Sequence, residues 1–229
     1  MPKIYLSPAA HGRDNPCGYD SACGENIHCN LYIDELEPYL LACGFAVRRN
    51  PKDRTGDRLK EAIAESNAWG ADLHYVAHTN AGGGAYSLLM VYDQGTAYGY
   101  AEKLAARRRE IYAGNVKISV QPQWDELRLT AAPAVYDEMV FHDNAKDIAW
   151  FHEHLREMAE ATAKAICDMF GAAFVDPYAK PAEPAPEPES GGDVWYRVQV
   201  GAFREKANAD RLCAELQGKG YAAFVKAGA

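Results

Sequence analysis

The segment ADLHYVAHTNA, residues 71–81, decides the fold class, because an apolar strand pattern runs directly into a histidine and a small polar turn. His78 stands at the end of this strand. A rigid buried strand often presents a metal ligand or a catalytic base in this way. The segment therefore predicts a buried strand with a functional site at its carboxyl end.

Strand and helix signals alternate on both sides of this segment. The predicted strands cover residues 4–7, 45–49, 72–78, 86–92 and 134–141. The predicted helices cover residues 27–43, 56–69, 97–112 and 145–170. This alternation predicts an α/β domain built on an open, mainly parallel twisted sheet flanked by helices. Ligands of such sheets bind outside the carboxyl ends of the strands.

The last predicted helix has the clearest periodicity. The residues of one face step by three and four positions, and they are Ile148, Phe151, Leu155, Met158, Thr162, Ile166 and Met169. Asn144 is placed to cap this helix, and Asp147 lies in its first turn, where a negative charge is favoured.

Two further segments place polar side chains at strand ends. SPAAHGRDN, residues 7–15, leaves a first short strand at His11, and PAVYDEMVFHDN, residues 133–144, carries Glu138 within an apolar run. An unpaired buried carboxylate is costly, so Glu138 indicates a function. Three strand ends that carry imidazole and carboxylate groups predict one common site.

The composition indicates one substantial domain plus a small module. The chain has 229 residues, of which 48% are hydrophobic, and a net charge of -8. Nucleic-acid binding normally shows as a basic patch or stripe, so no nucleic-acid partner is expected. No apolar run approaches the roughly 18 to 20 residues of a membrane span, and the N-terminus lacks the pattern of a signal peptide. We therefore expect synthesis in the cytoplasm without a signal peptide.

The cysteines are expected to remain reduced in that compartment. Cys17, Cys23 and Cys29 recur every sixth residue. This spacing fits none of the close pairs that are typical of structural zinc sites, so we assign these thiols no metal.

The composition changes at residues 176–193, DPYAKPAEPAPEPESGGD, where prolines and glutamates replace the apolar periodicity. Such a stretch predicts an extended linker. It separates a domain over residues 1–175 from a C-terminal piece over residues 194–229. That piece is predicted to be a βαβ half module, which is too small to bury its own sheet face. We expect it to need a partner, and self-association with a second copy of the chain would supply one.

The polar residues at the strand ends suit a metal. A catalytic zinc ion takes three protein ligands and keeps one open position. His11, Glu25 and His78 can supply two imidazoles and one carboxylate, which leaves Glu138 to manage protons. His28 is a rival ligand, because on a helix it lies one turn from Glu25 on the same face.

Residues 1 to about 171 resemble the zinc-dependent N-acetylmuramoyl-L-alanine amidases. The resemblance rests on the stretches PAAHGR, GENIHCNL, VAHTNA and PAVYDEMVFHDN. It implies that Zn2+ is held by His11, Glu25 and His78, and that Glu138 is the catalytic glutamate. It also implies hydrolysis of the amide between the lactyl group of N-acetylmuramic acid and L-alanine of the peptidoglycan stem peptide.

Three more residues are predicted to contact substrate. Asn80 follows the strand of His78, and His142 follows the strand of Glu138. Gln199 lies in the stretch VQVGAF of the C-terminal piece, which resembles the first half of a sporulation-related repeat (SPOR) domain. That resemblance implies affinity for glycan strands stripped of their stem peptides.

Two other functions stay open at this point. The stretch PAAHGR lacks the Pro-Gly-His-Gly-Gly pattern of the family. In a non-catalytic cell-wall-binding protein, this altered first histidine motif would have abolished metal binding. A zinc peptidase would instead cut within the stem peptide by similar chemistry. In each case the partner is peptidoglycan, and the protein is expected to act on the wall after lysis or release, as a host autolysin or a phage endolysin does.

Overall fold

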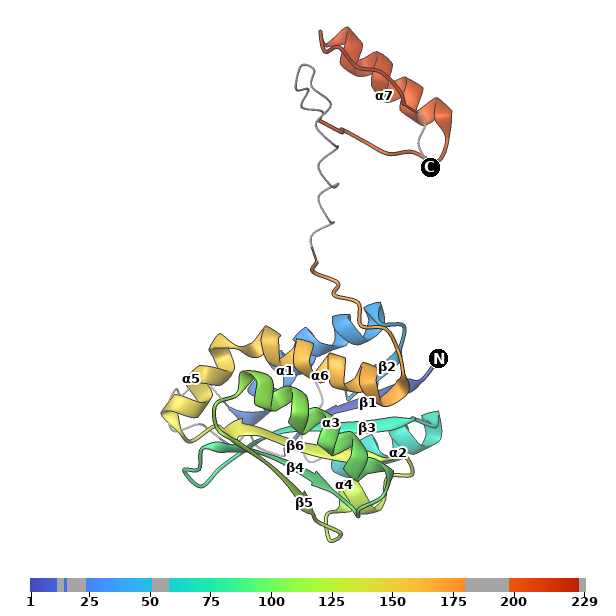
Figure 1. The fold of residues 1–229 in the computed structure, drawn as a ribbon. Helices are drawn as coiled ribbons and strands as arrows, with labels where there is room; N and C mark the ends of the chain where they lie inside the picture. Colours follow the sequence, from blue (N-terminus) through green and yellow to red (C-terminus); the bar gives the residue numbers. More distant parts are fainter. Residues whose placement is uncertain (12–14, 16–23, 51–57, 180–197, 227–229) are drawn as a thin grey trace. The chain divides into compact units, whose positions relative to one another are not determined.

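The computed structural model describes residues 1–11, 15, 24–50, 58–179 and 198–226 (Figure 1). The chain divides into two compact units, Met1–Lys180 and Pro181–Ala229. The first unit is an α/β domain, and the second contains one helix among its described residues. Among the described residues, no helix combines the length and the apolar composition of a membrane span.

A six-stranded sheet forms the centre of the first unit. Its strands are β1 (Lys3–Pro8), β2 (Ala46–Arg49), β3 (Leu73–Asn80), β4 (Tyr86–Val91), β5 (Asn115–Val120) and β6 (Ala134–Phe141). They lie in the order β2-β1-β3-β6-β4-β5, and the first four of them run parallel. β4 is antiparallel to β6, and β5 is parallel to β4. The mainly parallel sheet is thus confirmed, whereas the edge strand β5 is missing from the sequence prediction.

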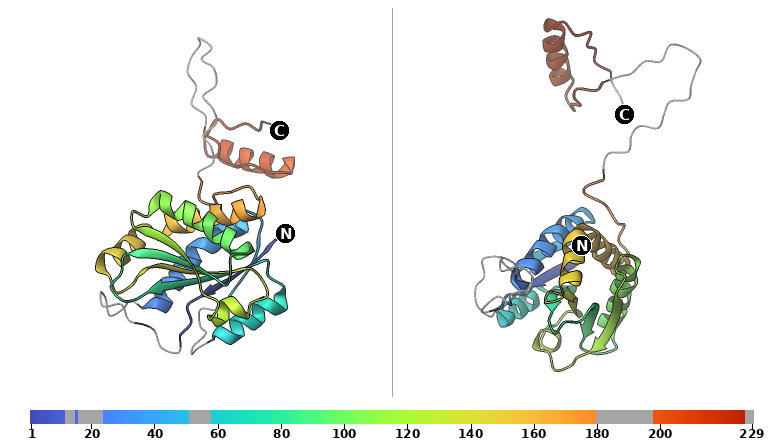
Figure 2. Two further views of the ribbon diagram at one scale, coloured as in Figure 1. Left: turned by 60° about the horizontal axis from the view of Figure 1, so that its bottom comes forward. Right: turned by 90° about the vertical axis from the view of Figure 1, so that its left-hand side faces the viewer.

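Helices cover both faces of this sheet (Figure 2). The helices of the first unit are α1 (Glu25–Ala42), α2 (Leu59–Trp69), α3 (Thr96–Ile111), α4 (Asp125–Arg128), α5 (Ala145–Glu153) and α6 (Leu155–Phe170). α1, α3 and α6 pack together on one face, and α2 and α4 lie on the other (Figure 1).

The residues of β3 alternate between these two faces. Tyr75 and Ala77 join the large core under α1, α3 and α6, whereas Val76 joins a smaller cluster with Leu127 of α4. His78 follows the alternation of Val76. The sheet therefore directs this histidine toward the face of α2 and α4.

The prediction of a single helix over residues 145–170 is wrong, because the chain breaks it into α5 and α6 at His154. This residue leaves the helical conformation with φ at -116° and ψ at 19°. Its ring stacks on that of Trp150 at 4.8 Å between centroids, and its Nδ1 lies 2.9 Å from the Trp150 carbonyl oxygen. The side chain thus contacts a carbonyl of the preceding helical turn. The cap at Asn144 is confirmed, since its side chain accepts two backbone N–H groups of the first turn of α5.

The C-terminal unit differs from the predicted strand, helix and strand. α7 (Lys206–Gly218) forms as expected, but the described residues 198–205 and 219–226 contain no strand. The side chains of Val198 and Phe224 are 87% and 74% exposed. Two short strands without a covering apolar layer gain little from burial, which explains why these flanking segments stay irregular.

Candidate metal centre

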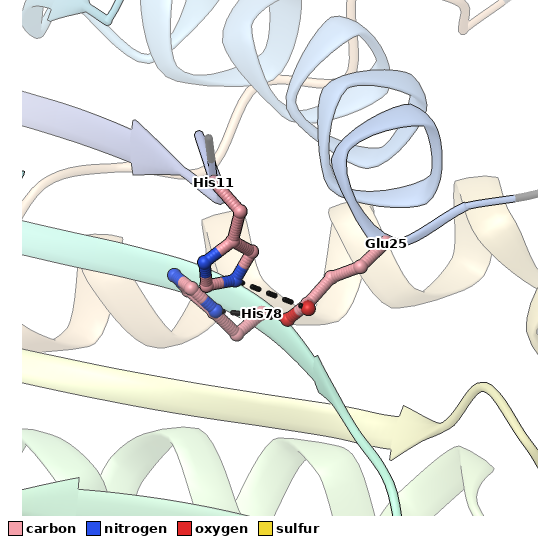
Figure 3. Close-up of side chains that lie close together, drawn as sticks. All are labelled: His11, Glu25 and His78. Atoms are coloured by element: carbon pink, nitrogen blue, oxygen red, sulfur yellow. Dashed lines mark hydrogen bonds and ion pairs between the residues drawn. The ribbon is translucent and has the colours of Figure 1, made fainter. Parts of the chain in front are cut away.

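Three side chains from separate parts of the chain meet at one edge of the sheet (Figure 3). His11 Nε2 lies 3.1 Å from Glu25 Oε2, and His78 Nδ1 lies 2.9 Å from Glu25 Oε1. The two imidazole rings are 5.1 Å apart between centroids and stand nearly edge to face. Each residue offers one ligand atom, and these atoms lie within 4.8 Å of one another. We call His11, Glu25 and His78 the metal triad.

The topology of the sheet brings the metal triad together. β1 and β3 are parallel neighbours, so His11 just beyond β1 and His78 in β3 reach the same edge. Glu25 is the first residue of α1, where the helix dipole favours a carboxylate. The backbone N–H of Thr79 donates to Glu25 Oε1 at 3.2 Å. Asn26, the next residue of α1, accepts the backbone N–H of His11 at 3.2 Å and so fixes the loop that carries this histidine.

Glu25 is the electrostatic centre of the metal triad. Its side chain is 4% exposed, whereas that of His11 is 39% exposed. Burial by itself raises the pKa of the Glu25 carboxyl, but hydrogen bonds from His11, His78 and Asn15 hold that pKa well below its ordinary value. The Asn15 amide donates to Glu25 Oε2 at 2.6 Å. The buried carboxylate is therefore ionised at neutral pH. Solvent reaches the metal triad on the side of His11, whose side chain is the more exposed of the two.

The donor set of the metal triad fits a zinc ion. Zinc binds histidine nitrogens and carboxylate oxygens, and its catalytic sites combine three protein ligands with an open position. The short separation of the three ligand atoms matches that requirement. His28, the rival from helical spacing, does not belong to this group, because it is fully buried beside Phe151 and His152. Burial is the main reason why the pKa of His28 falls to about 4.

Glu138 lies beside the metal triad on β6, where it is the register partner of His78. It is 8% exposed, and its Oε2 has no hydrogen-bond partner among the residues that the structure describes. Burial raises the pKa of Glu138 to about 7; the charge of Glu25 adds to this effect, and His78 opposes it. A carboxyl group with this pKa can accept and release a proton near neutral pH.

The predicted substrate contacts lie in three different environments. Asn80 ends β3, and its side chain accepts the N–H of Ala81 at 2.8 Å. His142 is 3% exposed, and its Nδ1 lies 3.0 Å from Thr79 Oγ1. Gln199 is exposed in the C-terminal unit. Asn80 thus follows the metal triad closely along β3, His142 packs against the end of that strand, and Gln199 belongs to a separate unit.

Two contributors to this region are missing from the sequence prediction. The Asn15 amide donates a hydrogen bond to Glu25. Asn15 lies four residues after His11, and this proximity in the sequence is all that could have indicated its role. α4 carries Glu126 to a cavity of about 230 Å³ that His11 and His78 also line. A single helical turn shows no periodicity, so no sequence pattern marks Glu126.

Two curated proteins are similar to this chain in sequence. N-acetylmuramoyl-L-alanine amidase CwlM of Bacillus licheniformis is 30% identical over 182 residues, which cover 75% of this chain and 64% of that protein. The sporulation-specific N-acetylmuramoyl-L-alanine amidase of Bacillus subtilis (strain 168) is 28% identical over 234 residues, which cover 98% of this chain and 84% of that protein. The match to this chain therefore spans less than two thirds of the length of the first relative and most of the second.

A solved structure and a family model extend these matches. The N-acetylmuramoyl-L-alanine amidase AmiC2 of Nostoc punctiforme matches with a TM-score of 0.65 at 15% identity, and the match covers 74% of this chain and 97% of that chain. It shows that the two chains share a fold. The SPOR domain family model matches residues 160–227. This match begins within α6 of the first unit and continues through α7.

Proposed function

This chain is a relative of the N-acetylmuramoyl-L-alanine amidases in sequence and shares their fold, and from that premise we propose that it is a peptidoglycan hydrolase with the same activity. The bond cleaved joins the lactyl group of N-acetylmuramic acid to L-alanine of the stem peptide. The observation that carries the proposal is the convergence of the metal triad and Glu138, a buried carboxyl whose Oε2 has no partner in the described part of the chain.

We propose that the metal triad holds zinc. Two imidazoles and one carboxylate form a ligand set that catalytic zinc sites use. A zinc ion held there would supply a Lewis acid that polarises the scissile carbonyl and acidifies the attacking water. The protein's own part is to orient the ligands: Thr79 and Asn15 fix the two oxygens of Glu25, and Asn26 fixes the backbone of His11.

Glu138 is proposed to move the proton. Its carboxylate takes a proton from the attacking water and passes it to the leaving amine of L-alanine. The position of Glu138 beside His78 on the neighbouring strand and its pKa of about 7, raised by burial, support this role.

We propose that the C-terminal unit binds the peptidoglycan strands on which the first unit acts. The match to the SPOR domain model and the exposed apolar side chains around α7, such as Phe203 and Phe224, support a surface that contacts another molecule. Gln199 lies beside this surface in the chain and is proposed to contact the glycan.

Mass analysis of digested peptidoglycan tests the proposed activity. The zinc-loaded protein is expected to release intact stem peptides that begin with a free L-alanine amine and to leave a free lactyl carboxylate on the muramic acid. Cleavage between amino acids of the stem would identify a zinc peptidase instead. Retained glycan binding without any cleavage would identify a non-catalytic wall-binding protein.

A further inference from the structure

A cavity of about 230 Å³ lies next to the metal triad, on the face of the sheet that α2 and α4 cover. His11 and His78 of the metal triad are among the residues that line it. Ser7, Asn50 and Glu126 also line it and carry polar side chains. None of these last three residues has a part in the metal triad or in the proton transfer assigned to Glu138.

The carboxyl of Glu126 is the main charge in this cavity. Glu126 is 3% exposed, and the hydroxyl of Ser7 donates to its Oε1 at 2.5 Å. His74 Nε2 lies 3.0 Å from the same oxygen. The neighbouring Asp125 also lines the cavity, but it pairs with Arg128 on the surface at 2.5 Å. Glu126 is therefore the carboxylate that a bound group would meet.

No lysine or arginine occurs among the described residues that line the cavity. A buried carboxylate is costly unless it is paired or hydrogen-bonded, and aromatic rings are compatible with a nearby cation. Trp124 and Tyr136 both line the cavity, and their rings meet edge to face at 5.0 Å between centroids. The cavity is thus suited to a cation or to a strong hydrogen-bond donor.

Asn50 gives independent evidence of a ligand. Asn50 is among the residues that line the cavity, and it is 2% exposed. Its Oδ1 is buried and accepts no hydrogen bond from any residue in the described ranges. Leaving such an oxygen unpaired costs free energy, so native proteins usually satisfy it with a partner, a water molecule or a ligand.

We propose that this cavity binds the side-chain ammonium group of a diamino acid in the stem peptide, with the Glu126 carboxylate as its counter-ion and Asn50 Oδ1 as a hydrogen-bond acceptor. The ligand class rests on the proposed function, because the stem peptide is the leaving group of that reaction. His11 and His78 belong to the metal triad and also line the cavity, so a stem peptide bound at the triad lies next to it. Glu126 and Asn50 are then specificity-determining residues.

Binding of two matched peptides tests this proposal without requiring turnover. The probes are N-acetyl-L-alanyl-γ-D-glutamyl-L-lysine and the same peptide with L-norleucine in place of lysine, which removes only the ammonium group. Calorimetry on the zinc-loaded full chain is expected to show about tenfold tighter binding of the lysine peptide. Equal affinity for the two peptides would overturn the proposal.

Variants locate the effect in the cavity. Glu126→Gln keeps the size of the side chain and its contact with Ser7 but removes the charge, so the ratio of the two affinities should fall to within about twofold. Asn50→Ala should lower the ratio by about threefold and serves as the second variant if Glu126→Gln fails to fold. Glu157→Gln is the control, since this 61% exposed carboxylate lies on α6, on the opposite face of the sheet. A ratio that Glu126→Gln and Asn50→Ala both leave unchanged would refute the assignment.

Turnover of a muramoyl peptide, measured separately, distinguishes this proposal from the proposed function. A protein that prefers the lysine peptide but releases no peptide from the muramoyl substrate would refute the amidase activity and keep the ammonium site. A protein that hydrolyses muramoyl peptides with lysine and with norleucine at equal kcat/KM, and binds the two probes equally, would keep the amidase and refute the ammonium site.

Discussion

The two faces of the sheet differ in the partners that they offer to two neighbouring carboxyl groups. Asp137 and Glu138 are adjacent in β6 and are both buried, but the alternation of the strand sends them to different faces. On the face of α1, α3 and α6, Asp137 Oδ2 accepts hydrogen bonds from Arg108 at 2.7 Å and from the Tyr75 hydroxyl at 2.6 Å. On the face of α2 and α4, Glu138 pairs with no lysine or arginine among the described residues. Its Oε2 and Asp137 Oδ1 both lack a hydrogen-bond partner there, so the arginine is what distinguishes the two carboxyl groups.

This difference separates the part of the domain that stabilises the fold from the part that is available for chemistry. The buried Asp137 is neutralised by a cation and anchors α3 to β6 through Arg108. The carboxyl groups of the other face, Glu138 and Glu126, are held in place without a lysine or arginine partner among the described residues. They remain able to interact with a substrate, a metal or a proton.

The largest expected effect comes from Glu138→Gln. Removing the proton acceptor should lower turnover by about 10²- to 10⁴-fold, because general acid–base catalysis typically contributes that much. Zinc content should stay unchanged, since Glu138 is not part of the metal triad. Release of stem peptides from purified cell walls measures turnover, with Glu157→Gln as the control. Turnover near that of the control would remove Glu138 from its proposed role.

On the face of α1, α3 and α6, removing the arginine partner of Asp137 is expected to lower the stability of the fold. Arg108→Met leaves the Asp137 carboxylate buried without its cation, which should lower the free energy of unfolding by about 3–5 kcal/mol. Urea denaturation measures the loss. The double variant with Asp137→Leu should recover most of it, because a buried ion pair can be replaced by apolar residues. A single variant as stable as the wild type would show that this pair does not anchor the fold.

A pH-dependent prediction concerns Glu138 in the metal-free protein. Burial raises the pKa of Glu138 from 4.5 to about 7, so between these values the folded state holds a proton that the unfolded state has released. Its contribution to stability therefore falls as pH rises through this window. Glu138→Gln removes this dependence and should be more stable than the wild type at pH 8 by on the order of 2 kcal/mol. The difference should disappear below about pH 4.5, and a constant difference across the window would contradict the assignment.

The smallest expected effect is in the loop between β3 and β4, which belongs to neither face. Asp143 accepts the backbone N–H groups of Gly82 at 2.6 Å and Gly83 at 2.9 Å. Because these hydrogen bonds are exposed, Asp143→Ala should lower the free energy of unfolding by less than about 1 kcal/mol. Urea denaturation checks this value. A loss as large as that of Arg108→Met would mean that the contrast between the faces does not explain where stability lies.

The sequence predicts the residues of the site better than it predicts the short and peripheral elements of the fold. His11, His78 and Glu138 stand at or near the carboxyl ends of β1, β3 and β6, and these strands are consecutive in the sheet. Strand ends that carry polar groups are visible in the sequence, and parallel neighbours bring them to one edge. Glu25 joins them because α1 begins at that same edge.

The elements missing from the prediction have different causes. In β5, Val116, Ile118 and Val120 alternate with Lys117 and Ser119, which is the pattern of a half-buried strand, so the sequence carries this signal and the prediction overlooks it. α4 has four residues, which are too few to show a helical period, so the prediction also lacks Glu126. The break at His154 depends on a contact with Trp150 that leaves the apolar face of the two helices intact, and the periodicity alone therefore predicts one continuous helix.

The most direct measurement is X-ray diffraction from crystals of the zinc-loaded protein, recorded on both sides of the zinc absorption edge. We expect one anomalous peak, with nitrogen atoms of His11 and His78 and an oxygen of Glu25 at about 2.0–2.2 Å from the ion. A zinc ion bound elsewhere, or a metal triad whose imidazoles do not share an ion at saturating zinc, would contradict the metal site on which the proposed reaction depends.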